Sequence, residues 1–151
     1  MYQETVKKLI LRKLTISTAE SITGGLISKM ITDVSGSSEI LKESYVVYSN
    51  DAKITILGVD AGLIEKYGVV SKEVAKDMAV KLKMITGKDI CVSVTGNAGP
   101  NVCDDKPVGR VYVGIDYLDD VNVHELTLDG SREEIREKTA NFVFDKIEEL
   151  L

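Results

Sequence analysis

The sequence predicts an α/β protein, a three-layer α/β/α sandwich in which helices cover both faces of a mixed five-stranded sheet. Three short apolar runs alternate with segments of helical periodicity, and two further strands precede a long final helix. Strands that alternate with helices are joined by right-handed crossovers, so the first three strands should be parallel. We expect the strand order 2-1-3-4-5, with strand 4 antiparallel.

The first 94 residues contain the alternating part of this pattern. Helical periodicity marks five segments: residues 2–12, residues 25–34, short helices from near Asp51 and near Asp60, and residues 71–85. Strand-like apolar runs lie between and after them: residues 14–18, 45–48 and 90–94. Ser71 is placed to cap the longest of these helices, and Gly87 lies just beyond its end.

The second half of the chain predicts antiparallel strands. Only a loop of about a dozen residues separates residues 90–94 from the next strand, 109–115, which is too short for a parallel crossover. Residues 121–128 return as its hairpin partner, and residues 131–150 form a helix. Its expected buried stripe consists of Ile135, Phe142, Val143, Ile147 and Leu150.

Length and charge narrow the class of protein. A chain of 151 residues with 44% apolar content predicts a single domain, residues 1–151, with one core. The net charge of −5, without a concentrated Lys/Arg block, argues against a nucleic-acid partner. Because no apolar run reaches the roughly 18 residues that span a bilayer, and residues 1–4 lack a signal-peptide pattern, we expect a cytoplasmic protein without a membrane partner.

Cysteine and histidine are scarce. Cys91 lies in an apolar strand pattern and Cys103 in a polar loop, and two such cysteines form neither a disulfide framework nor a zinc site. His124 is the only histidine, which argues against a zinc site and a histidine-based triad. We expect no metal and no cofactor.

Residues 17–25 carry the most informative motif, because they combine hydroxyls, a carboxylate and two glycines between a strand and a helix. Thr23 is expected to cap the helix, while Gly24 and Gly25 let a ligand approach the backbone, so an anion or oxyanion would be stabilised there. An ordinary capped turn is the alternative. In the expected strand order, residues 20–25, 48–53 and 95–100 converge at the carboxyl ends of the strands, where α/β proteins bind ligands.

Six ordered motifs resemble the C-terminal domain of the competence/damage-inducible CinA family, over essentially the whole chain. They are Thr18-Ala19-Glu20-Ser21-x-Thr23-Gly24-Gly25, Gly36-Ser37-Ser38, Tyr48-Ser49-Asn50-x-Ala52-Lys53, Gly68-Val69-Val70-Ser71, Thr95-Gly96-x-Ala98-Gly99-Pro100 and Lys106-Pro107-Val108-Gly109. The resemblance implies a nicotinamide mononucleotide deamidase that releases nicotinate mononucleotide and ammonia. It also implies the same fold, no metal and commonly a homodimer, whereas larger members add an N-terminal molybdopterin-binding-like domain.

Hydrolysis of an amide without a metal needs a nucleophile, a proton acceptor and donors for the oxyanion. A Ser–Lys pair meets the first two needs here. Lys53 falls in the first turn of a helix that Asn50 or Asp51 is expected to cap, where the helix dipole and burial would lower the pKa of its amine. A solvated helix lysine is the alternative, and the family resemblance favours the catalytic role.

Ser21 is our first choice for the nucleophile, because the amides of residues 23–25 would hold the oxyanion. Ser38 is its rival, since the family motif marks that position, although a turn serine is the simpler interpretation. Tyr48 is expected to orient Lys53 or the substrate amide; a half-buried tyrosine with its hydroxyl in water is the alternative.

The substrate-binding residues are expected to be Thr23, Gly24, Gly25, Thr95, Gly96 and Arg132. By the resemblance, Arg132 binds the phosphate, because a guanidinium matches phosphate bidentately. Thr95 and Gly96 end the third strand and would hydrogen-bond the substrate, although an ordinary strand end would have the same residues. Glu20 is expected to pair with a lysine or to cap backbone amides.

Three departures from the family pattern leave a second function open. Residues 101–105 replace a longer glycine-rich run, Asn97 replaces an aliphatic residue, and Ser131 stands in place of an aspartate. These changes spare Ser21 and Lys53 but affect the outer ligand contacts. The alternative to the deamidase is therefore a catalytically silent nucleotide-binding module of the same family.

Overall fold

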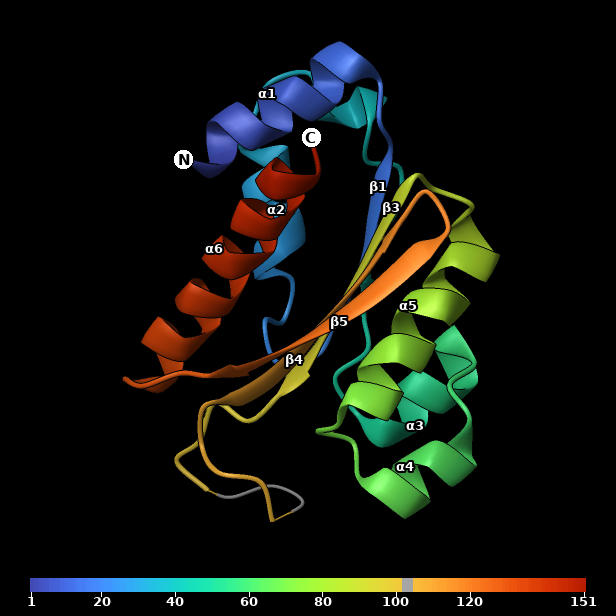
Figure 1. The fold of residues 1–151 in the computed structure, drawn as a ribbon, viewed down its shortest axis with the longest axis vertical. Helices are drawn as coiled ribbons and strands as arrows, with labels where there is room; N and C mark the ends of the chain where they lie inside the picture. Colours follow the sequence, from blue (N-terminus) through green and yellow to red (C-terminus); the bar gives the residue numbers. More distant parts are fainter. Residues whose placement is uncertain (102–104) are drawn as a thin grey trace.

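The computed structural model describes residues 1–101 and 105–151 (Figure 1). A five-stranded sheet in the order β2-β1-β3-β4-β5 runs through the middle of the molecule. Figure 1 shows α1, α2 and α6 on one face of this sheet and α3, α4 and α5 on the other. The predicted three-layer class and the predicted strand order are confirmed.

The described residues contain the following elements. In chain order they are α1 (Tyr2–Arg12), β1 (Ile16–Glu20), α2 (Leu26–Thr32), the 3₁₀ turn η1 (Ser37–Glu39), β2 (Tyr45–Val46), α3 (Asn50–Ala52), the π-helical turn η2 (Lys53–Leu57), α4 (Ala61–Tyr67), α5 (Lys72–Thr86), β3 (Ile90–Gly96), β4 (Arg110–Tyr117), β5 (Asp120–Thr127) and α6 (Arg132–Leu150). β1 begins and ends two residues later than predicted. β2 is shorter than predicted, because an edge strand pairs on one side only and residues beyond Val46 turn toward α3.

The pairing of the strands places their carboxyl ends together. β1 pairs in parallel with both β2 and β3, and Glu20 lies opposite Val46 on one side and Val94 on the other. β3 with β4 and β4 with β5 are antiparallel, as predicted. The residues that follow Glu20, Val46 and Val94 therefore emerge at the same edge of the sheet.

Apolar clusters fill the space between the layers on both faces of the sheet. On one face, α1, α2 and α6 pack against β1, β3 and β4, and Phe144 is 1% exposed within this cluster. The predicted stripe of α6 is partly wrong: Phe144 is buried, Phe142 is only half-buried, and Leu150 is exposed. On the other face, α5 packs Val74, Met78 and Leu82 against the sheet.

Helix caps follow the sequence in some places only. Ser71 accepts a hydrogen bond from the Val74 N–H, which confirms it as the cap of α5. Ser131 accepts from the Glu134 N–H while the Glu134 side chain accepts from the Ser131 N–H, so the two residues form a capping box at the start of α6. Ser131, which stands in place of the family's aspartate, is therefore a working N-cap. At the start of α2, by contrast, the Glu20 side chain and not Thr23 accepts from the first N–H groups.

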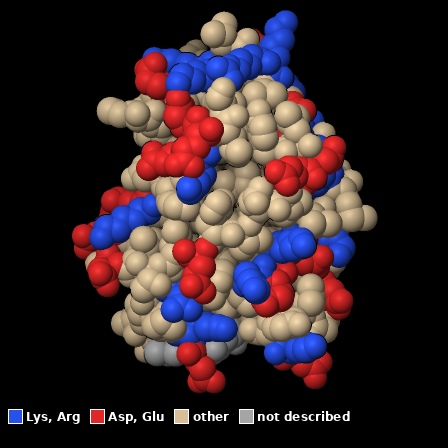
Figure 2. All heavy atoms as spheres, in the orientation of Figure 1, with Lys and Arg blue, Asp and Glu red and all other residues tan. Residues whose placement is uncertain are grey.

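The molecular surface is mixed in charge. Lys and Arg side chains are interspersed with Asp and Glu on the face that Figure 2 shows. In the described part of the chain, no helix is both long and apolar enough to cross a membrane. Cys91 is a buried free thiol whose pKa is raised by desolvation, while Cys103 lies outside the described residues.

Close contact between α5 and the sheet predicts that Gly114 tolerates no side chain. An added Cβ at Gly114 would lie 2.5 Å from the Ser93 Oγ and 2.7 Å from the Ala75 carbonyl oxygen. Gly114→Ala should therefore lower the free energy of unfolding by about 3 kcal/mol through overpacking.

The matched control is Gly87→Ala. Gly87 has a φ of +65° but no atom within 4 Å of an added Cβ, so its cost should be about 1 kcal/mol. Urea unfolding measures both variants. Equal losses for the two variants would contradict the packing argument.

Candidate active site

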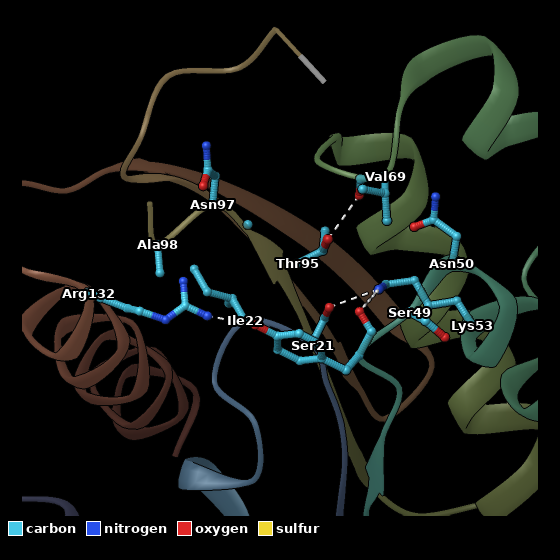
Figure 3. Close-up of a pocket in the computed structure, with 12 residues that line it drawn as sticks. Ser21, Ile22, Ser49, Asn50, Lys53, Val69, Thr95, Asn97, Ala98 and Arg132 are labelled. Atoms are coloured by element: carbon cyan, nitrogen blue, oxygen red, sulfur yellow. Dashed lines mark hydrogen bonds between the residues drawn. The ribbon is translucent and has the colours of Figure 1, made fainter. Parts of the chain in front are cut away.

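A cavity of about 240 Å³ opens at the carboxyl ends of β1, β2 and β3 (Figure 3). Its walls come from segments far apart in the sequence, as the topology requires. The lining residues are Ser21, Ile22, Tyr48, Ser49, Asn50, Lys53, Val69, Thr95, Gly96, Asn97, Ala98 and Arg132. Six of the predicted site residues are therefore brought together: Ser21, Tyr48, Lys53, Thr95, Gly96 and Arg132.

Ser21 and Lys53 meet in a buried hydrogen bond. The Lys53 Nζ donates to the Ser21 Oγ at 2.8 Å, across 32 residues of sequence. Lys53 is 1% exposed and Ser21 is 7% exposed. A buried amine in contact with a serine hydroxyl is the arrangement that a Ser–Lys pair requires.

The position of Lys53 depends on an unusual helical start. Ser49 caps α3 by accepting from the Ala52 N–H at 2.9 Å, so the predicted cap at Asn50 or Asp51 is wrong. Lys53 is the first residue of the π-helical turn η2, and its Nζ also reaches the Tyr48 carbonyl oxygen at 3.5 Å. π-Helical turns are rare and occur often at functional sites, because they redirect a side chain without ending the helix.

Arg132 and Tyr48 form the rim of the cavity. The Arg132 Nη2 donates to the Tyr48 hydroxyl at 2.6 Å, and its Nη1 donates to the Gly99 carbonyl oxygen at 2.7 Å. Tyr48 is 57% exposed, so the alternative of a half-buried tyrosine with a free hydroxyl is wrong. Arg132 therefore brings a fixed positive charge to the mouth of the cavity.

Thr95 and Gly96 form the floor at the end of β3. The Thr95 hydroxyl donates its proton to the Val69 carbonyl oxygen at 2.9 Å, so toward a ligand it can act only as an acceptor. An added Cβ at Gly96 would lie 2.9 Å from the Arg110 carbonyl oxygen. This close approach explains the glycine.

Thr23, Gly24 and Gly25 do not line the cavity. Thr23 is fully buried and donates to the Glu20 carboxylate at 2.8 Å, and α2 has Gly25 as its N-cap without a side-chain hydrogen bond. The prediction that Thr23 caps α2 is therefore wrong. Glu20 caps it instead, which confirms one of the two roles expected of Glu20.

Ser38 lies at the opposite end of the sheet from Lys53. It belongs to η1 and is exposed, and Leu41, shortly after η1, bridges to Ile16 at the start of β1. Lys53 instead meets the residue that follows the end of β1. The fold therefore separates the two candidate serines and brings only Ser21 to the lysine.

Several lining residues escaped the sequence analysis. Ser49 and Asn50 stand in the same motif as Tyr48 and Lys53, which was the signal that could have found them. Val69 reaches the cavity from the loop before α5, and its place in the motif Gly68-Val69-Val70-Ser71 was the signal that could have found it. Among the residues described, no group of three or more His, Cys, Asp or Glu side chains is placed to hold a metal ion.

Comparison with known proteins gives a consistent result. A family model described as the CinA C-terminal domain matches residues 1–151. A protein of Thermoanaerobacter sp. (strain X514) named "Putative competence-damage inducible protein" is 44% identical over 152 residues, covering 100% of this chain and 37% of its own length. The "CinA-like protein" of Petrotoga mobilis is 43% identical over 138 residues, or 91% of this chain and 34% of its own. The chain thus spans just over a third of the length of these curated relatives.

A solved structure agrees with these sequences. The competence/damage inducible protein CihA from Agrobacterium tumefaciens is 35% identical, with a TM-score of 0.91 over 99% of this chain and 94% of that chain. A CinA superfamily protein from Escherichia coli, at 24% identity and a TM-score of 0.94 over 100% of this chain and 91% of that chain, has the same fold. From the match over its whole length, this chain belongs to the CinA C-terminal domain family.

Proposed function

We propose that the protein hydrolyses the carboxamide of nicotinamide mononucleotide to nicotinate mononucleotide and ammonia. The observation that carries the proposal is the buried 2.8 Å contact between the Lys53 amine and the Ser21 hydroxyl in a cavity with a guanidinium at its mouth. A serine beside a buried lysine suits hydrolysis of an unactivated amide, and the guanidinium suits a phosphate group. The substrate itself is carried over from the family resemblance.

The first half of the reaction forms an ester. The Ser21 Oγ attacks the carboxamide carbon while the neutral Lys53 Nζ takes the hydroxyl proton. The tetrahedral intermediate collapses as the Lys53 ammonium returns that proton to the leaving nitrogen, which departs as ammonia. An ester between Ser21 and the nicotinoyl group remains.

The second half consumes one water. Lys53 removes a proton from the water as its oxygen attacks the ester carbon, and the Ser21 oxygen leaves with the proton that Lys53 returns. The products are a carboxylic acid and the free serine, so atoms and charges balance. We assign the oxyanion in both halves to the backbone N–H of Ile22, the residue after the nucleophile, since residues 23–25 lie outside the cavity.

In this proposal, residues at the rim of the cavity bind the substrate. We assign the phosphate to Arg132, which holds two hydrogen bonds and has further donors for an anion. Tyr48 orients the Arg132 side chain rather than Lys53, because its hydroxyl bonds the guanidinium. The homodimer and the cytoplasmic location stay predictions from the resemblance and the sequence.

Replacement of Lys53 should separate turnover from binding. Lys53→Met keeps the length of the side chain and removes the base, so turnover should fall by at least about 100-fold while nucleotide affinity persists through Arg132. Ser21→Ala should abolish turnover almost completely, because no ester can form. Ammonia release measures turnover, and calorimetry measures binding.

Ser38→Ala is the matched control for Ser21→Ala, because it removes an exposed hydroxyl at the other end of the sheet. It should keep wild-type turnover. Activity that survives in both Lys53→Met and Ser21→Ala would rule out the Ser–Lys mechanism. A wild-type protein that binds the nucleotide without releasing ammonia would instead favour the silent binding module.

A chelator should leave the activity unchanged. The proposed steps use only Ser21 and Lys53, so protein treated with EDTA and then freed of it should release ammonia at the untreated rate. Recovery of lost activity on adding a divalent metal would overturn the metal-free mechanism.

A further inference from the structure

Glu20, the residue before the proposed nucleophile, is a fully buried carboxylate. We infer that Glu20 is a positioning residue that holds Ser21 against Lys53, an inference that rests on the proposed function. It acts through the backbone of the turn between β1 and α2, and it does not touch the reacting atoms.

Every lone-pair direction of the Glu20 carboxylate is used. Its Oε1 accepts from the Thr23 hydroxyl at 2.8 Å and from the Ile27 N–H at 2.9 Å. Its Oε2 accepts from the Thr18 hydroxyl at 3.0 Å and from the Ser28 N–H at 3.0 Å. Four donors around two oxygens is the pattern of an ionised carboxylate.

The charge is stabilised by the start of α2. Ile27 and Ser28 belong to the first turn of that helix, where N–H groups lack helical acceptors and the dipole favours an anion. Gly25, the N-cap, has no side chain that could supply these acceptors. Glu20, five residues before Gly25, supplies the acceptors instead, so its carboxylate ties the end of β1 to the start of α2.

This tie fixes the backbone that carries Ser21. The Glu20 carbonyl accepts from the Val47 N–H at 2.9 Å, and the Ser21 N–H donates to the Val94 carbonyl at 3.0 Å. Within the turn, the Gly24 N–H donates to the Ser21 carbonyl at 3.0 Å. Neighbouring residues of an extended chain point to opposite faces, so Glu20 binds α2 while Ser21 faces Lys53.

The outer side of the turn is held by α6. The Arg136 Nη2 donates to the Thr23 carbonyl oxygen at 3.0 Å. Without the Glu20 anion, the turn would keep this contact but lose the link that Glu20 makes to the amides of Ile27 and Ser28. Because a shift of about 1 Å in a reacting group can cost about 100-fold in rate, a looser turn should appear in turnover before it appears in binding.

Glu20→Gln tests the inference. The amide keeps the shape of the side chain but replaces one acceptor oxygen with a donor, so two of the four hydrogen bonds are lost. We expect kcat on nicotinamide mononucleotide to fall about 10- to 100-fold with KM within about 3-fold of wild type. In a crystal structure of the variant, the Ser21 Oγ and Lys53 Nζ should lie beyond hydrogen-bond distance.

Asp89→Asn is the matched control. Asp89 accepts from the N–H and the hydroxyl of Thr15 at 2.9 and 3.0 Å, so it ties the amino end of β1 to β3, away from the cavity. The Asp89→Asn variant should therefore have a lower melting temperature and an unchanged kcat. A kcat loss in Asp89→Asn equal to that in Glu20→Gln would reduce the role of Glu20 to general stability.

Two further outcomes would overturn the inference: an unchanged kcat in Glu20→Gln, whatever its KM, or an intact Ser21–Lys53 contact in its crystal structure. If wild-type protein releases no ammonia, the proposed function fails, and the crystal structure alone decides whether Glu20 holds the contact. Should Glu20→Gln not fold, Thr23→Val removes a single donor and should lower kcat about 3- to 10-fold, while Thr139→Val, which removes a buried hydroxyl within α6, should not.

Discussion

Parallel pairing of β1 with strands on both of its sides is the constraint on which the site depends. Glu20 lies opposite Val46 and Val94, so the segments that follow β1, β2 and β3 leave the sheet at the same level. Without that register, Ser21 and Lys53, separated by 32 residues, would have no reason to meet. The antiparallel pair β4 and β5 extends the sheet beyond β3 and supports α5 and α6 without contributing to the reacting pair.

Two ionisable side chains are buried next to this junction, and they are stabilised in different ways. Glu20 receives four donors, two of them from the start of α2. Lys53 contacts a hydroxyl and a carbonyl oxygen in its surroundings. The carboxylate accepts from two hydroxyls and two backbone N–H groups, whereas the amine lies against a serine hydroxyl.

Alternation of strands and helices was enough to predict the layers and the parallel direction of the first three strands, because crossovers are right-handed. The position of strand 1 between strands 2 and 3 was an assumption that the structure confirms. The site was harder. Thr23 looked like a cap since capping motifs are local, but the real cap reaches α2 from β1, and no short-range pattern reveals it. The choice between Ser21 and Ser38 needed the fold, because both stand in motifs and only their places along the sheet differ. Lys53 was found through the family motif, and its π-helical turn left no mark in the sequence.

The hydrogen bond between Arg132 and Tyr48 has a consequence for access to the cavity. Arg132 begins α6 on one face of the sheet, and Tyr48 leads into α3 on the other (Figure 1), so this bond joins the two helical layers across the mouth. Tyr48 is largely in water, where a single hydrogen bond contributes only about 1 kcal/mol. Exposed side chains change rotamer in picoseconds to nanoseconds. Rotation of the Tyr48 side chain would therefore break this link between the layers on a timescale far shorter than that of a moving domain.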